Sequence, residues 1–241
     1  MKLSDFTTLT FDCYGTLIDW ESGMIENLAA LVAKADRALE RDDILDAHGR
    51  HEHAQQAETP TMNYRALLAT VYMRLAAEWH VPIDNAAAAA YGNSVGSWPA
   101  FPDSAEALAY LKQHFKLVIL SNVDRASFAE SNARLGVTFD HIVTAEDVGS
   151  YKPAIRNFDH MLRELDAAGI AKTDILHTAE SLFHDHTPAN SVGLATAWIH
   201  RRHAVKGSGA TRPVADMPSI DFRFTSMQAL ADAHRAEQLS A

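Results

Sequence analysis

Short apolar segments typical of β-strands alternate with helical segments over most of the second half of this chain, and this order constrains the fold more than any other feature. A first strand is predicted at residues 9–11, followed by buried strands at 116–121, 141–144, 174–179 and 196–200, with helices between the later strands at about 126–135, 154–168 and 188–192. Strands that alternate with helices pair in parallel through right-handed crossovers. The sequence therefore predicts an α/β fold with a Rossmann-like parallel sheet.

Residues 20–98 have a different pattern, in which apolar side chains recur at helical spacing, for example from Tyr64 to Ala76. A chain of 241 residues is long enough for one core with one inserted module. We expect a core domain formed by residues 1–19 and 99–241 and a helical domain formed by residues 20–98.

Residues 201–218 contain several glycines and prolines, which predicts a long surface loop. A C-terminal element near residues 221–224 and a last helix from Ser226 follow it. The loop could border a ligand site, but we expect a solvated connector.

Polar side chains follow the predicted strands at the points where the strands end. They are Asp12 after the first strand, Ser121 and Asn122 at the second, Lys152 on the loop after the third, and Glu180, Ser181 and Asp185 after the fourth. Ligands bind outside the carboxyl ends of the strands in open parallel sheets. We therefore expect these side chains to converge on one site.

Asp12 is the candidate for the reacting group at this site. A carboxylate after a buried strand could be a metal ligand, a general base, a nucleophile or a structural cap. Thr16 lies four residues further along the same loop, where its hydroxyl could hold one carboxylate oxygen, and Lys152 could pair with the ionised form and lower its pKa. Nucleophilic attack requires such an ionised, oriented carboxylate, so we favour the nucleophile.

Four segments, in order, resemble the motifs of the haloacid dehalogenase (HAD) superfamily. They are Phe11–Leu17 (FDCYGTL), Leu120–Asn122 (LSN), Val148–Pro153 (VGSYKP), and Glu180–Ser181 together with Asp185. The resemblance covers the predicted core and implies the HAD fold, in which a helical cap is inserted directly after the first motif. The helical segment at residues 20–98 matches that arrangement.

Tyr14 indicates the type of reaction. Phosphatases of this superfamily usually carry a second aspartate two residues after the nucleophile, which protonates the leaving alcohol as a general acid. This chain has Tyr14 at that position, and a halide needs no proton to leave. The site therefore resembles that of the L-2-haloacid dehalogenases, which implies hydrolysis of small 2-haloacids through an ester on Asp12, without a cofactor.

The same resemblance assigns roles to the other residues of the site. Thr16 and Lys152 would orient Asp12, and Asp185 would activate water. Ser121 would bind the substrate carboxylate, Asn122 would help to hold the halide, and Tyr14 and Tyr151 would line the pocket. An arginine of the cap would also contact the halide. Arg50 is the candidate by position, and Arg65 competes with it.

Glu180 favours a different reaction on the same fold. Dehalogenases of this type tend to have a small polar residue at this position, whereas Mg²⁺-dependent phosphatases have an acid. Asp12, Glu180 and Asp185 would then hold Mg²⁺, and Asp12 would attack the phosphorus of a small phosphate ester. A catalytically inactive HAD-fold binding protein is a second alternative, although the intact Asp12 and Lys152 argue against it.

The charge balance limits the partners of the chain. Twenty-one Lys and Arg residues against 31 Asp and Glu residues give a formal charge of −10, which disfavours nucleic acid and anionic membrane surfaces. Local donors can still bind a small anionic substrate. The single cysteine, Cys13, fits a reducing compartment, and no apolar run is long enough for a membrane span or a secretory signal. We expect a cytoplasmic enzyme, and the family resemblance suggests a homodimer.

Overall fold

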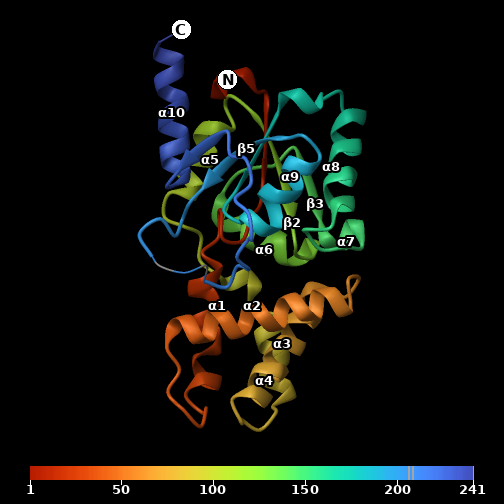
Figure 1. Ribbon diagram of the computed structural model, residues 1–241, viewed down its shortest axis with the longest axis vertical. Coiled ribbons are helices and arrows are strands. Elements are labelled where there is room, and N and C mark those ends of the chain that lie inside the picture. Colours follow the sequence, from red (N-terminus) through yellow and green to blue (C-terminus); the bar gives the residue numbers. More distant parts are fainter. Residues whose placement is uncertain (206, 208, 241) are drawn as a thin grey trace.

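The computed structural model describes residues 1–205, 207 and 209–240. Over these residues, the centre of the molecule is a sheet of six strands in the order β3-β2-β1-β4-β5-β6 (Figure 1), and neighbouring strands pair in parallel throughout. The strands are β1 (Thr8–Phe11), β2 (Lys116–Ser121), β3 (His141–Thr144), β4 (Ile175–Ala179), β5 (Ala195–Ile199) and β6 (Phe222–Phe224). The predicted Rossmann-like parallel sheet is confirmed.

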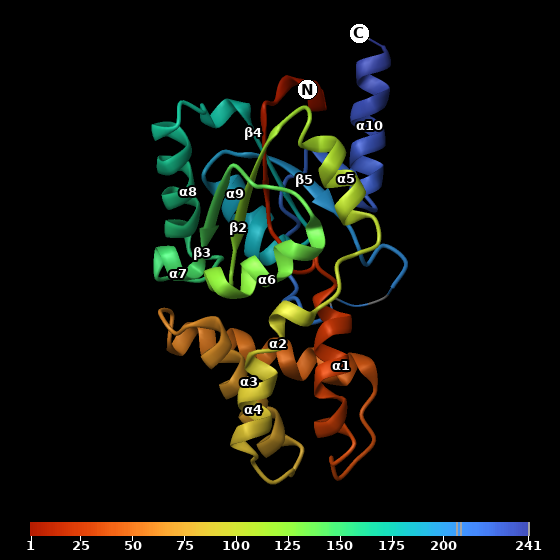
Figure 2. The same ribbon diagram turned by 180° about the vertical axis from the view of Figure 1, so that it is seen from behind.

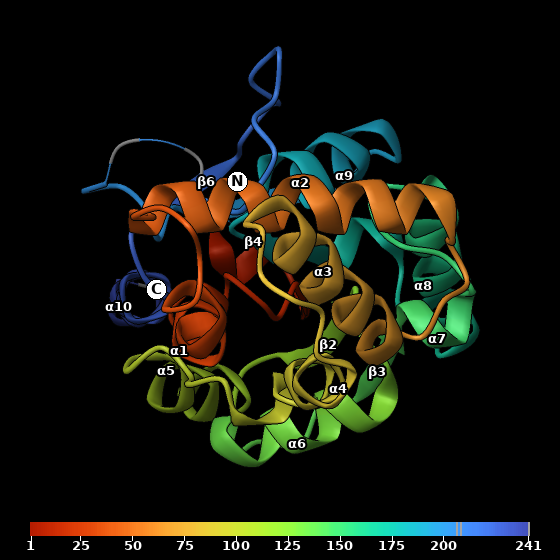
Figure 3. The same cartoon turned by 90° about the horizontal axis from the view of Figure 1, so that it is seen from below.

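Helices cover both faces of the sheet (Figures 2 and 3). One face carries α5 (Ser104–Leu111), α6 (Arg125–Leu135) and α10 (Met227–Leu239), and the other carries α8 (Ile155–Ala167) and α9 (Thr187–Ser191). Within β2, Leu117 and Ile119 pack into the apolar core on the first side, whereas Val118 and Leu120 pack into the core on the second. Successive side chains of a strand point to opposite faces, so a strand covered on both faces is apolar throughout.

A group of four helices lies beyond the carboxyl ends of the strands (Figure 1). These are α1 (Trp20–Val32), α2 (Arg41–Glu58), α3 (Tyr64–Glu78) and α4 (Asn85–Gly92). The group begins abruptly at Trp20 because the carboxylate of Asp19 accepts a hydrogen bond from the Ser22 backbone N–H at 3.1 Å, which caps the first turn. The helical segment is thus where the sequence predicts it, and the domain boundaries at residues 20 and 98 stay a prediction.

The remaining short elements connect these layers. They are the 3-10 helices η1 (Leu3–Asp5), η2 (Val95–Ser97) and η3 (Lys172–Asp174), the helical turn α7 (Ala145–Val148), and the π-helix η4 (Leu182–His186). The sequence predicts only a helix at 188–192 after β4, whereas the structure has η4 directly before α9. π-Helical turns contain an extra residue and are frequent at functional sites. Here the turn carries Asp185.

None of the helices in the described part of the chain is both long enough and apolar enough to cross a bilayer.

Candidate active site

Asp12 lies directly beyond the carboxyl end of β1 and is 7% exposed. The hydroxyl of Thr16 donates to Asp12 Oδ2 at 2.8 Å, and the Thr16 hydroxyl oxygen accepts the backbone N–H of Glu180 at 2.9 Å. The accepted N–H orients the hydroxyl, so its hydrogen points at Asp12. The chain can turn this tightly because Gly15 has a φ of 94°, and a β-carbon there would lie 3.1 Å from the Trp20 ring.

Lys152 holds the other oxygen of Asp12 from the loop after β3. Its ammonium donates to Asp12 Oδ1 at 2.9 Å, to Asp185 Oδ1 at 2.6 Å and to the Leu120 carbonyl at 2.9 Å. These three bonds use all three of its hydrogens. Since the side chain is only 1% exposed, the ammonium is fixed between the two carboxylates.

Asp185 is held by a second residue, His177, in the middle of β4. His177 Nε2 lies 3.1 Å from Asp185 Oδ1, and its Nδ1 lies 2.8 Å from the Thr10 hydroxyl of β1. Asp185 Oδ2 is buried and has no hydrogen-bond partner among the described residues. Sequence reasoning misses His177, although a histidine inside an otherwise apolar central strand is a signal of a buried polar contact.

The carboxyls of Asp12 and Asp185 and the ammonium of Lys152 form one buried network. Burial lowers the pKa of Lys152, but the two carboxylates outweigh it and raise the pKa above its usual value. Burial raises the pKa of Asp185, but Lys152 and His177 outweigh it and hold the pKa well below its usual range. For Asp12 burial is the largest effect and the pKa rises, although Lys152 opposes it. The ionisation of Asp12 therefore depends on Lys152 staying in place.

Ser121 and Asn122, at the end of β2, present different groups to the site. The Asn122 amide donates to the Lys152 carbonyl at 3.0 Å and accepts the Lys152 backbone N–H at 2.6 Å. The hydroxyl of Ser121 is buried and has no partner among the described residues. Both residues line the pocket at Asp12. The Asn122 amide, which the sequence predicts to hold a halide, is thus hydrogen-bonded to the backbone of Lys152, whereas the Ser121 hydroxyl is available to a ligand.

The two tyrosines predicted for the pocket wall lie in different places. Tyr14 lines the pocket, and its hydroxyl forms a 2.8 Å hydrogen bond with the hydroxyl of Ser131 on α6. Tyr151 is buried outside the pocket lining and donates to the carbonyl of Met62, between α2 and α3. The structure therefore does not bring Tyr151 to the pocket, and its hydroxyl instead joins the loop that carries Lys152 to the helical group.

The structure places neither predicted arginine at the pocket. Arg50 points from α2 toward α3 and pairs with Glu78 at 3.0 Å, and Arg65 pairs with Glu130 of α6 at 2.8 Å. The pocket is instead lined by Arg212, from the loop between β5 and β6. This loop borders the site and is not the solvated connector that the sequence suggests.

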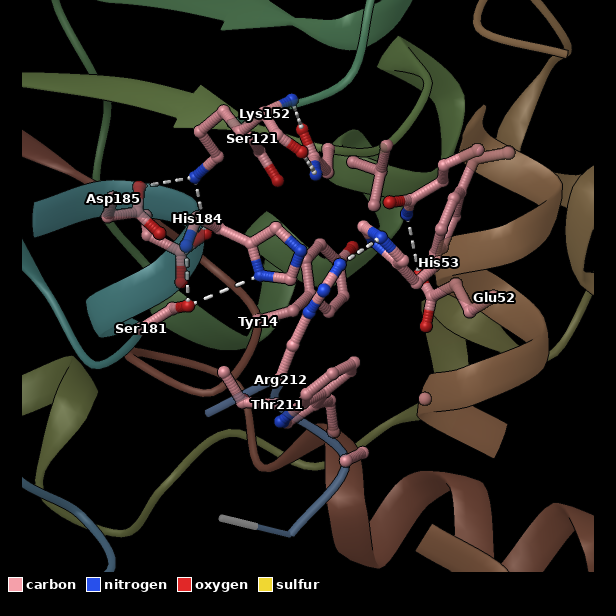
Figure 4. Close-up of a pocket in the computed structure, with 18 residues that line it drawn as sticks. Tyr14, Glu52, His53, Ser121, Lys152, Ser181, His184, Asp185, Thr211 and Arg212 are labelled. Atoms are coloured by element: carbon pink, nitrogen blue, oxygen red, sulfur yellow. Dashed lines mark hydrogen bonds and ion pairs between the residues drawn. The ribbon is translucent and has the colours of Figure 1, made fainter. Parts of the chain in front are cut away.

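The pocket lies between the strand ends and α2, with a volume of about 610 Å³ that includes its mouth (Figure 4). Three groups of side chains form its walls: Asp12, Ser121, Lys152 and Asp185 at the strand ends, Glu52, His53, Gln56 and Tyr64 on the helical side, and Thr211 with Arg212 on the loop. Figure 4 shows the helical group and the strand-end group on opposite sides of the pocket. A small polar molecule in it would contact both.

Glu52 is a buried carboxyl on the helical side of the pocket. Its Oε1 accepts hydrogen bonds from the Tyr64 hydroxyl and from Gln56 Nε2, both at 3.0 Å. Burial raises the pKa of Glu52 to about 7 and lowers that of His48, 3.4 Å away, to about 3. Sequence reasoning misses Glu52, yet its spacing of four from His48 and seven from Leu45 places it on the buried face of α2.

Glu180 lies outside the Asp12 pocket. It follows β4, but its side chain lines a neighbouring hollow with Arg201 and Arg202. Burial raises the pKa of Glu180 to about 8. The Glu180 side chain therefore lines a different hollow from the nucleophile, although Asp12 is near enough to contribute to the rise in its pKa.

A Mg²⁺ site of Asp12, Glu180 and Asp185 does not fit this arrangement. The Lys152 ammonium already binds one oxygen of Asp12 and one of Asp185, and Glu180 lines a separate hollow. Over residues 1–205, 207 and 209–240, no group of three or more His, Cys, Asp or Glu side chains is placed to hold a metal ion. We therefore derive no step through magnesium.

The parallel sheet, the carboxylate after its first strand and the lysine that joins it define an α/β protein with an aspartate-centred site. A family model described as haloacid dehalogenase-like hydrolase matches residues 6–177. The chain belongs to this family of hydrolases. A search of curated proteins finds no match.

Solved structures share the HAD fold over nearly the whole chain. The L-2-haloacid dehalogenase PA0810 has 22% identity and a TM-score of 0.77, covering 96% of this chain and 99% of that one. The L-2-haloacid dehalogenase from Xanthobacter autotrophicus with chloropropionic acid covalently bound has 18% identity and a TM-score of 0.76, covering 95% and 98%. The HAD-hydrolase YfnB from Bacillus subtilis bound to magnesium has 18% identity and a TM-score of 0.72, covering 94% and 97%.

Proposed function

We propose that this hydrolase removes the halogen from a small 2-haloacid through a covalent ester on Asp12. The observation that carries the proposal is the way Asp12 is held, with Thr16 on one carboxylate oxygen and Lys152 on the other. No second acid follows it at position 14, where Tyr14 forms its hydrogen bond with Ser131. A leaving halide needs no proton, so such a site has the groups that the reaction requires.

In the first step, the Asp12 carboxylate attacks the carbon that carries the halogen. A carbon–oxygen ester bond forms, the carbon–halogen bond breaks, and its electron pair leaves with the halide. Lys152 and Thr16 keep the carboxylate ionised and oriented, which a carboxylate nucleophile needs. The Ser121 hydroxyl, which has no partner among the described residues, can donate to the substrate carboxylate.

In the second step, water attacks the ester carbonyl of Asp12. Asp185 Oδ2 has no partner among the described residues and can accept a hydrogen bond from this water. One proton of the water ends on the hydroxyl of the 2-hydroxyacid product, the other is released to solvent, and Asp12 returns as a carboxylate. The solved L-2-haloacid dehalogenases that share the fold support this proposal.

The test is to assay halide release from chloroacetate and phosphate release from p-nitrophenyl phosphate, each with Mg²⁺ and with EDTA. Halide release that EDTA does not affect is the expected result, and it should disappear in Asp12→Asn. Phosphate release that requires Mg²⁺ would replace the proposal with a phosphatase. If neither substrate reacts and Asp12→Asn changes only ligand affinity, the inactive binding protein is the better description.

A single turnover in H₂¹⁸O tests the covalent step itself. Because water attacks the carbonyl of the Asp12 ester, the label should enter the Asp12 carboxylate, where mass spectrometry of the peptide detects it. Label found only in the 2-hydroxyacid would mean that water attacks the substrate directly.

A further inference from the structure

The pocket contains a cationic side chain that no carboxylate neutralises. The charge of Lys152 is shared between Asp12 and Asp185. Arg212 forms no ion pair with an acidic side chain in the described ranges. Its Nη1 donates to His53 Nε2 at 2.7 Å, and its guanidinium carbon lies 5.2 Å from the centroid of the Phe183 ring. The accepting nitrogen shows that His53 is neutral, so Arg212 keeps its full positive charge.

His184 adds a hydrogen-bond donor next to this cation. The Ser181 hydroxyl oxygen accepts the His184 backbone N–H at 3.0 Å and lies 3.2 Å from His184 Nδ1. When this hydroxyl donates to Nδ1, the ring proton of His184 lies on Nε2. His184 Nε2 is buried and has no partner among the described residues. Burial lowers the pKa of His184 to about 4, so the ring is a neutral donor at neutral pH.

The ring of Phe183 brings the two groups together. Its centroid lies 5.0 Å from that of His184 and 5.6 Å from that of His53, and Arg212 lies over the same ring. Figure 4 shows the His184 ring between the Lys152–Asp185 pair and Arg212. Both donors thus line the same pocket as the nucleophile.

We propose that Arg212 and His184 form an anion subsite in the pocket of Asp12, which binds the substrate's carboxylate or the halide that leaves it. This inference rests on the proposed function and assigns the anion contact to the loop between β5 and β6 and to η4, not to the helical group. An anion is needed there to match the charge of Arg212, since Asp12 and Asp185 are held by Lys152. The planar guanidinium offers paired donors to a carboxylate or one strong donor to a halide.

The experiment measures anion binding separately from turnover. Propionate, a 2-haloacid analogue without halogen, and bromide are titrated calorimetrically into the wild-type enzyme and into Arg212→Gln, Arg212→Lys and His184→Ala. Arg74→Gln is the matched control, because Arg74 is an arginine of the helical group that pairs with Glu58. The KM and kcat for chloroacetate are measured on the same variants.

We expect Arg212→Gln to weaken anion binding about 10-fold or more, in line with the loss of a charge-assisted hydrogen bond. His184→Ala should weaken it less, Arg212→Lys should restore part of it, and Arg74→Gln should change it less than 2-fold. KM should follow these affinities more closely than kcat. Weakening of propionate alone identifies the subsite with the substrate carboxylate, and weakening of bromide alone identifies it with the leaving halide.

The proposal is overturned if neither anion binds the wild type, or if Arg212→Gln binds both anions as the wild type does. It is also overturned if Arg74→Gln weakens binding as much as Arg212→Gln. If His184→Ala has no effect on either anion, His184 is not part of the subsite. Because propionate and bromide do not react, binding without any halide release from chloroacetate would refute the dehalogenase function and leave the subsite in place.

Discussion

The ammonium of Lys152 lies 2.9 Å from the carboxylate of Asp12, although 140 residues separate them in the chain. The contact joins the loop after β3 to the loop after β1 across the carboxyl edge of the sheet. Both side chains are buried, so the ion pair is protected from solvent screening. Removing Lys152 leaves the buried carboxylates of Asp12 and Asp185 without a compensating charge, and removing Asp12 leaves Lys152 with Asp185 as its one remaining carboxylate of this pair.

Lys152→Met should abolish most of the activity and destabilise the fold. Asp12 and Asp185 would face each other without the cation, so Asp12 would take up a proton and lose nucleophilicity. We expect a fall in kcat/KM of at least about 1000-fold and a loss on the order of 3 kcal/mol in the free energy of unfolding. Halide release and urea unfolding measure the two effects. Lys172→Met is the control, since Lys172 is exposed and donates to the Val192 carbonyl. Equal losses in both variants would contradict the role of Lys152.

Thr16→Val should slow the reaction without unfolding the chain. The substitution keeps the shape of the side chain but removes the hydroxyl that donates to Asp12 Oδ2 and accepts the Glu180 N–H. A hydrogen bond to a charged group contributes about 1.5–3 kcal/mol, so kcat for halide release should fall roughly 10- to 100-fold. Thr16→Ser retains the hydroxyl and should retain most of the activity; a Ser variant as slow as the Val variant would mean that the methyl group matters instead.

Asn122→Asp separates the two hydrogen bonds that hold the lysine loop. An introduced carboxylate can still accept the Lys152 N–H but cannot donate to the Lys152 carbonyl, whereas Asn122→Ala loses both bonds. If Asn122 acts by positioning Lys152, both variants should lower kcat, with the Ala variant the lower and about 1–3 kcal/mol less stable. If Asn122 instead contacts the halide, bromide affinity should fall in both while unfolding is unchanged.

As the pH is lowered, the rate of ester formation should begin to fall at a higher pH than it would for an aspartate with the ordinary pKa. The reactive form of Asp12 is the ionised one, and burial raises its pKa, with the charge of Asp185 adding to the rise. Ester formation, followed by intact-mass spectrometry, should therefore decline as the pH falls toward this raised pKa. In Asp185→Asn the decline should move to lower pH, because one source of the rise is gone. An unmoved profile would show that Asp185 does not influence Asp12.

The sequence predicts those parts of the site that lie at the ends of the parallel strands. Because parallel strands end at one edge, the order of the strands alone predicts that Asp12, Ser121, Lys152 and Asp185 lie together. Contacts between layers do not follow in this way: Arg212 reaches the pocket through a loop whose path no local pattern encodes. Glu180 follows β4 as predicted, yet its side chain lines a neighbouring hollow, and a motif position does not determine which of two adjacent hollows a side chain enters.

Glu52→Gln should stabilise the protein increasingly as the pH rises. Burial raises the pKa of Glu52 from 4.5 to about 7 in the folded state. The folded state therefore holds a proton that the unfolded state releases, and its stabilising effect, complete below the unfolded value, is lost as the pH rises through about 7. A glutamine stays neutral and can still accept the hydrogen bonds of Tyr64 and Gln56. Between pH 5 and 8 the variant should gain on the order of 3 kcal/mol over the wild type.

Urea unfolding at several pH values measures this difference, with Glu58→Gln as the control because that carboxylate lies on the same helix and is exposed. If the two stability curves run parallel, the Glu52 carboxyl is solvated and its pKa is not raised. If they diverge, Glu52 is largely uncharged below about pH 7. At such pH values the pocket has no negative charge at Glu52 that would repel an anionic substrate. The affinity for propionate should then fall from pH 6 to pH 8 in the wild type and stay more nearly constant in Glu52→Gln.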